Sequence, residues 1–212
     1  YNRRIKIMSG IVGSYFNTRG SGVVAKLGTD GQVFTSAGAG LSQGFEAAAA
    51  GGKLLQVVST NYTTATSMSF SANTVTDITG ITVNITPAAT SSKIFVMCRA
   101  MVECGTVEIE NSMIGLKRDS TEVGGVSQTG SNRNYGITVF SIGYYSQENG
   151  STPEVASFHF LDSPSSTSEL TYKATFRHEG NGTLYINRTI TDDDAANKER
   201  GTCNITVMEI GA

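Results

Sequence analysis

The chain has 212 residues, a formal net charge of −2 at pH 7 and 16% charged residues. A chain this close to neutral lacks the basic excess of a general nucleic-acid binder, and no segment approaches the ~20 apolar residues of a membrane-spanning helix. We therefore expect neither a nucleic-acid partner nor membrane insertion. The 24 glycines, frequent Ser and Thr, and the absence of Trp favour short strands joined by many turns.

The first segment, residues 1–27, carries basic residues and no acidic ones. We predict an extended arm that docks on a partner through Arg3, Arg4, Lys6 and Arg19. An acidic protein surface or a nucleic acid would attract such an arm, and a solvated terminus would have the same composition. The sequence leaves these interpretations open.

Residues 28–52 form a Gly/Ala-rich neck with little apolar surface to bury. Asp30 and Gly31 predict a tight turn, and FEAAAAGGK offers at most one helical turn before Gly51. Fully extended, about 25 residues span ~80 Å. The neck can therefore separate the arm from the domain that follows, residues 53–212.

From residue 53 onward the apolar residues recur with a period of two, which is typical of half-buried antiparallel strands. In two such strands the residues predicted to face the core are Ile81, Val83, Ile85, Leu170, Tyr172, Ala174 and Phe176. The residues between them, among them Thr175 and Arg177, are predicted to face solvent. The segments 93–102, 136–145 and 156–161 are largely apolar on both faces. We expect these strands to be covered on both sides, by a second layer or by another subunit.

Ten strands are predicted, at 53–59, 66–70, 76–86, 93–103, 107–117, 136–146, 154–162, 169–179, 182–188 and 202–210. Turn-forming sequences such as ENGSTP and SPSSTS separate them, and no long amphipathic helix is present. This spacing predicts an all-β fold, an antiparallel β-sandwich of the jelly-roll type.

No residue pattern points to catalysis or to a cofactor. His159 and His178 lie in predicted strands, and we interpret both as structural because no serine lies in a nucleophile elbow. The run Asp192–Asp194 could attract a hard cation, but it lacks the spacing of a calcium loop, so a solvated acidic loop is preferred. We predict no catalytic residue, no metal and no cofactor.

The three cysteines have no zinc-type spacing. Cys98 and Cys104 lie roughly 20 Å apart on one strand, too far for a disulfide. Either could meet Cys203 on a neighbouring strand, but buried free thiols are the preferred interpretation.

An aromatic group in the same domain could stack sugars, although a core or subunit interface is the more usual setting for such residues. Its members are Tyr135, Phe140, Tyr144 and Tyr145.

Several stretches resemble a recurring C-terminal domain of structural proteins of marine bacteriophages, chiefly those of cyanobacteria. These stretches are DGQVFTSAGAG, FEAAAAGGKLLQVVST, TDITGITVNITPAATSSKIFVM, SFHFLDSPSSTSELTYKATFR, LYINRT and ITVMEIGA. The resemblance covers about residues 28–212 and implies a fibre-like or decorating virion protein, a homotrimer with a distal β-sandwich. It implies a location on the virion surface and identifies no activity.

We therefore expect a non-enzymatic virion structural protein, a short tail or head fibre that docks on other virion proteins through residues 1–27. Exposed loops would contact a host glycan or protein. The residues predicted to face a receptor are Asn132, Arg133, Asn134, Gln147, Asn149, Asp193 and Asp194. The alternatives are a capsid-decorating protein without a receptor and a carbohydrate-binding module. A polysaccharide-cleaving enzyme ranks last, because such enzymes need paired carboxylates across a cleft and the acidic residues here fall mostly in turns or beside basic residues.

Overall fold

The computed structural model describes residues 32–35, 44–47, 53–105, 111–125, 133–140 and 152–211. The chain separates into two compact units, Tyr1–Gly51 and Gly52–Ala212. The predicted docking residues Arg3, Arg4, Lys6 and Arg19 lie outside the described residues, as do the receptor-facing residues Asn132, Gln147 and Asn149.

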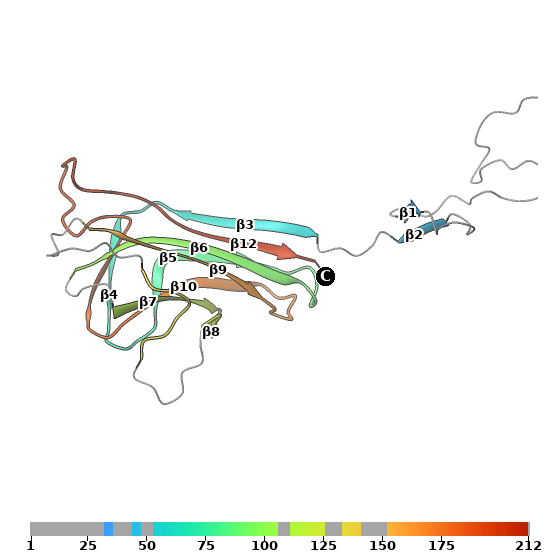
Figure 1. Ribbon diagram of the computed structural model, residues 1–212, viewed down its shortest axis with the longest axis horizontal. Coiled ribbons are helices and arrows are strands. Elements are labelled where there is room, and N and C mark those ends of the chain that lie inside the picture. Colours follow the sequence, from blue (N-terminus) through green and yellow to red (C-terminus); the bar gives the residue numbers. More distant parts are fainter. Residues whose placement is uncertain are drawn as a thin grey trace, which may run out of the picture. The chain divides into compact units, whose positions relative to one another are not determined.

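The first unit contains a two-stranded hairpin, β1 (Gln32–Thr35) and β2 (Gly44–Ala47) (Figure 1). Phe34 pairs with Phe45 in antiparallel register. The first residues of FEAAAAGGK therefore lie in a strand, and residues 48–52, where a helical turn was also expected, lie outside the described residues.

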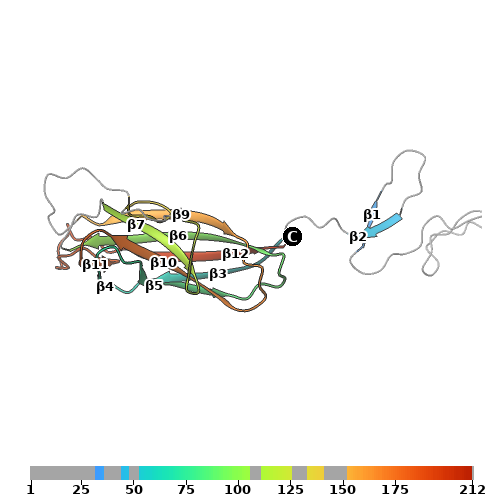
Figure 2. The same cartoon turned by 90° about the horizontal axis from the view of Figure 1, so that it is seen from below.

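The second unit is an antiparallel β-sandwich, as predicted (Figures 1 and 2). The small sheet has the order β5-β10-β7-β8, and the large sheet the order β3-β12-β6-β11-β4 with β9 also paired to β6. The large-sheet strands are β3 (Leu54–Tyr62), β4 (Thr66–Phe70), β6 (Lys93–Cys104), β9 (Glu154–Asp162), β11 (Gly182–Ile186) and β12 (Cys203–Ile210). The small-sheet strands are β5 (Thr76–Ile85), β7 (Ser112–Arg118), β8 (Thr121–Val123) and β10 (Leu170–His178).

Two strand predictions need correction. Within 136–140 the structure has only an isolated bridge between Thr138 and Ile114, not the predicted strand, and residues 141–146 lie outside the described part. The short strand β8 was missed, because the turn KRDST closes a hairpin in which Arg118 pairs with Thr121. Asp119 takes a positive φ of 55° there, a conformation that Asp tolerates better than most residues.

One apolar core lies between the two sheets. All seven residues predicted to face it are buried, including Ile81, Tyr172 and Phe176. The Phe176 ring lies 4.8 Å from that of Phe70, edge to face, which joins the two sheets. Alternating apolar residues therefore decided which face of each strand is inside.

A polar network is buried at the edge of this core. Asp162 accepts hydrogen bonds from Arg118 Nη1 at 2.6 Å and from the Tyr172 hydroxyl at 2.7 Å. Burial lowers the pKa of Arg118, but the ion pair with Asp162 outweighs it and the pKa is raised. Burial and the neighbouring carboxylate also raise the pKa of Tyr172, so its hydroxyl stays protonated and donates.

Candidate functional site

The second unit has two distinct ends. The Gly211 amide donates to the Lys53 carbonyl at 2.8 Å, so the chain enters this unit beside its last strand. Tyr62, at the other end of β3, lies about 30 Å away at ~3.3 Å per residue. We call the Lys53 end proximal and the Tyr62 end distal.

The segment 187–202 projects near the distal end (Figure 1). Strand β11 pairs with β6 at Val102–Cys104, and β12 pairs with β6 at Lys93–Arg99. Strand β9 occupies the opposite side of β6 from both. The segment 187–202 therefore connects β11 to β12, and these two strands pair with successive parts of the same edge of β6. Long ordered loops in compact domains are usually functional.

Buried polar residues hold the root of this excursion. Asn187 takes a positive φ of 61°, and its amide donates to the carbonyls of Tyr62 and Thr64. The fully buried Glu103 accepts hydrogen bonds from the amides of Thr152 and Ile190, both at under 3 Å. A long loop with an anchored root can present its tip in a defined place.

Two of the predicted receptor-facing residues, Asp193 and Asp194, lie exposed near the tip of this loop. Asp192 does not join them, because Arg200 binds it with two hydrogen bonds of 2.7–2.9 Å. The hydrogen bond from Arg200 is the main cause that lowers the pKa of Asp192. Across the described ranges, no three His, Cys, Asp or Glu side chains are placed to hold a metal ion.

A second distal cluster contains the other two predicted residues within the described part, Arg133 and Asn134. Arg133 is exposed, and the amide of Asn134 donates to the Asn111 carbonyl at 2.6 Å. Arg177 Nε donates to Asn134 Oδ1 at 3.0 Å, and its guanidinium lies 4.4 Å from the centre of the Tyr135 ring. The structure therefore places Asn134 in an ordered side-chain network at the same end as the loop 187–202.

The outer face of the large sheet carries an apolar row that the sequence only partly indicated. The strand registers align one apolar side chain from each of four neighbouring strands: Val57 of β3, Met208 of β12, Phe95 of β6 and Leu161 of β9. Val57 is 51% exposed and Leu161 45%. Leu54 and Leu55 add exposed apolar surface at the proximal end of β3.

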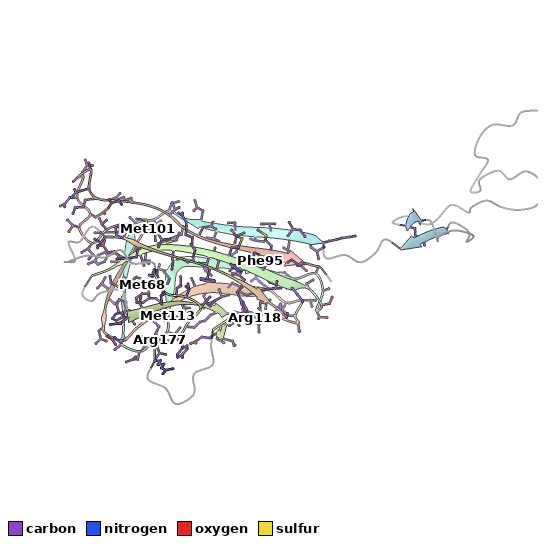
Figure 3. The ribbon with its side chains drawn as sticks, in the orientation of Figure 1. Met68, Phe95, Met101, Met113, Arg118 and Arg177 are labelled. Atoms are coloured by element: carbon purple, nitrogen blue, oxygen red, sulfur yellow. The ribbon has the colours of Figure 1, made fainter. Side chains whose placement is uncertain are left out.

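The next row on this face is more polar, and three of its four side chains line a shallow groove of about 470 Å³. Ser59, Thr206, Met97 and His159 are aligned across the same four strands. Figure 3 shows Phe95 and Met101 on β6, which carries side chains of both rows. The apolar row is therefore a band across the sheet, and the row on its distal side is polar except for Met97, which is 45% exposed.

The two histidines lie in different surroundings. His178 is 2% exposed, accepts a hydrogen bond from the Gly180 amide at 2.8 Å and packs on Phe70. His159 is exposed beside Phe95, on the opposite face of β9 from the buried Asp162. The His178 ring is therefore part of the core, and the His159 ring lies on the outer face of the large sheet.

All three cysteines are free and buried. Burial is the main cause that raises the pKa of Cys98 and of Cys203, so both thiols are poor nucleophiles. The preferred interpretation of buried free thiols is confirmed.

No protein-family model matches this chain, and no curated protein matches its sequence. The resemblance to marine phage virion proteins therefore stays a prediction. Among the described residues, no helix has the length and hydrophobicity needed to cross a membrane.

Sequence reasoning missed the apolar row as a unit, although it noted that β6 and β9 are apolar on both faces. The alternation of Val57 in β3 and Met208 in β12 was visible, but which residues face one another depends on strand register. Arg177 and Thr175 were predicted only as solvent-facing residues. Arg177 is instead half-buried on Tyr135, and Thr175 is only 3% exposed.

Proposed function

We propose that the protein is a non-enzymatic structural subunit that self-associates, as a trimer, and displays its distal loops. The apolar row Val57–Met208–Phe95–Leu161 carries this proposal. A contiguous apolar band on a sheet face is unusual for a monomer and typical of an interaction surface. Its most suitable occupant is a second copy of this chain, because the apolar band continues onto β3, which is an edge strand among the described strands.

The positions of the two ends support display. The chain enters at Lys53, close to Leu54 and Leu55, whereas the loop 187–202 and the Asn134 cluster lie at the distal end. Association near the entry point leaves the distal loops exposed. In the setting that the resemblance implies, residues 1–27 dock on other virion proteins and the subunit is a fibre-like appendage on the particle surface.

The test is the mass of the full chain in solution, by light scattering, for the parent and for Val57→Asp. We expect a trimer for the parent and monomers for the variant, because a buried unpaired carboxylate opposes association. Asn61→Asp is the matched control: it adds a charge to the same face of β3, four residues away, and should remain trimeric.

A monomeric parent would overturn self-association and favour the capsid-decorating alternative, in which the shell alone holds the subunit. A trimeric Val57→Asp variant would place the interface elsewhere. Either result is informative because Val57 is half exposed in the single chain, so its replacement should leave folding intact.

A further inference from the structure

The outer face of the small sheet carries a separate concave site. A cavity of about 360 Å³ lies over β7 and β10, bounded by β8 and by residues around Gly136. The residues that matter for its chemistry are Met113, Gly115, Glu122, Tyr135, Thr175 and Arg177. Its size is within the range of small-ligand pockets.

Glycine keeps the floor of this cavity open. Gly115 pairs with Thr175 across β7 and β10, and a Cβ atom at Gly115 would lie 2.7 Å from Thr175 Oγ1. Any side chain at Gly115 would cover that hydroxyl. Thr175 is only 3% exposed, and within the described residues its hydroxyl has no hydrogen-bond partner, so this residue forms part of the cavity floor.

The cavity has a cationic side chain at one end and an anionic side chain at the other. Arg177 lies opposite Met113 in the sheet, and Glu122 lies opposite Lys117. Met113 and Lys117 are four residues apart on β7, about 13 Å at ~3.3 Å per residue. The cation and the carboxylate therefore line opposite ends of the cavity, with Gly115 and Thr175 between them. Figure 3 shows Met113 and Arg177 together toward one end of the small sheet and Arg118 toward the other.

Both charged groups are available. Arg177 is oriented by its Nε hydrogen bond to Asn134 and by the Tyr135 ring, but its two Nη atoms bond to no described residue. Glu122 forms no ion pair or hydrogen bond within the described ranges. Lys117 does not neutralise it, because the Lys117 ammonium lies 2.7 Å from Asp77.

We propose that this cavity binds a hexuronate, an acidic six-carbon sugar. The Arg177 Nη atoms form a fork that matches the planar carboxylate of the sugar. The Glu122 carboxylate accepts hydrogen bonds from vicinal hydroxyls at the opposite end of the ring, and the ring lies over the floor formed by Gly115 and Thr175. The inference deepens the proposed function, since it names a class of ligand for the distal end. It rests on the proposed function only for its biological setting.

The test is saturation-transfer NMR on the full chain, with glucuronate and galacturonate as probes and glucose as the uncharged control. We expect one uronate to bind with a Kd of about 1 mM, and glucose at least about tenfold more weakly. Arg177→Gln and Glu122→Gln should each weaken the uronate about tenfold or more, since each loses a charge-assisted hydrogen bond. Arg177→Lys, which keeps the charge but loses the fork, should bind at an intermediate level.

Arg99→Gln is the matched control, because Arg99 is exposed on the outer face of the large sheet. It should bind as the parent does. Failure of both uronates to bind, or unchanged binding by Arg177→Gln, would overturn the site. Displacement of the uronate by an equal concentration of acetate would overturn its assignment to a sugar and leave a simple anion site.

The assembly variant separates this inference from the proposed function. Val57→Asp alters the large sheet, so it should lose association and retain uronate binding. A monomeric parent that binds uronate would contradict the proposed self-association and support the uronate site. A trimer that binds no uronate would support self-association and contradict the uronate site.

Discussion

At the residue scale, the ionic groups of the small sheet are arranged by cross-strand pairing. Lys117 and Lys173 are direct partners on β7 and β10, an arrangement that repulsion disfavours. Asp77 on β5 reaches both ammonium groups, at 2.7 and 2.8 Å. Burial raises the pKa of Asp77, but hydrogen bonds from the two lysines outweigh this, and the pKa is lowered below its ordinary 3.8.

We expect Asp77→Asn to destabilise the fold by about 1 kcal/mol at pH 7, because the two lysines lose their shared partner. A carboxylate with a lowered folded-state pKa contributes stability above its unfolded pKa, and this contribution is lost as the pH falls through the folded-state value. The difference between parent and variant should therefore shrink as the pH falls below the ordinary pKa of 3.8. Urea unfolding at pH 7 and at an acidic pH below that ordinary value measures it.

Asp193→Asn is the control for that experiment, since within the described chain Asp193 pairs with no cation. Its stability should follow the parent at both pH values. A pH-independent difference for Asp77→Asn would contradict the ion-pair explanation and point to a loss of packing instead.

At the element scale, a glycine lets one strand of the small sheet approach the large sheet. Gly80 in β5 has a φ of +82°, and a Cβ atom there would lie 2.3 Å from the Tyr62 ring. The register between β5 and β10 shifts in the same region, between Lys173 and Thr175. This irregularity allows β5 to continue while the ring of Tyr62, at the distal end of β3, packs against its backbone.

Gly80→Ala should lower the free energy of unfolding by about 2–4 kcal/mol, since the new methyl group adds both a clash and an unfavourable φ. Chemical denaturation monitored by tyrosine fluorescence measures this change. Gly125→Ala is the control, because its nearest neighbour would lie at 3.4 Å and its φ is not positive. Equal effects of the two changes would show that the Tyr62 contact does not determine the geometry of β5.

At the scale of the whole molecule, the second unit contains its own core. Every buried apolar residue of the described chain lies between Phe70 and Val207. The two strands of the first unit pair only with each other among the described strands. The second unit can therefore be studied as a separate fragment, residues 53–212.

A fragment of residues 53–212 should unfold in one cooperative step, with a Tm within about 4 °C of the full chain, the shift that 1 kcal/mol produces at this size. Calorimetry at matched subunit concentration measures it. Light scattering on the same samples should give a trimer for both. A trimer only for the full chain would move assembly into residues 1–52, and a broad, non-cooperative transition would contradict the independence of the domain.

The sequence alone determined the all-β class, the strands with clear alternation and the side of each that is buried, because these depend on local period and turn chemistry. Ile81, Tyr172 and Phe176 were placed correctly for this reason. Only the tertiary structure determined which residues of different strands lie side by side. Strand register aligned one apolar row, Val57, Met208, Phe95 and Leu161. Packing over Gly115 brought Glu122, Tyr135 and Arg177 to one cavity. Such contacts between distant strands depend on the pairing of the whole sheet and not on any local pattern.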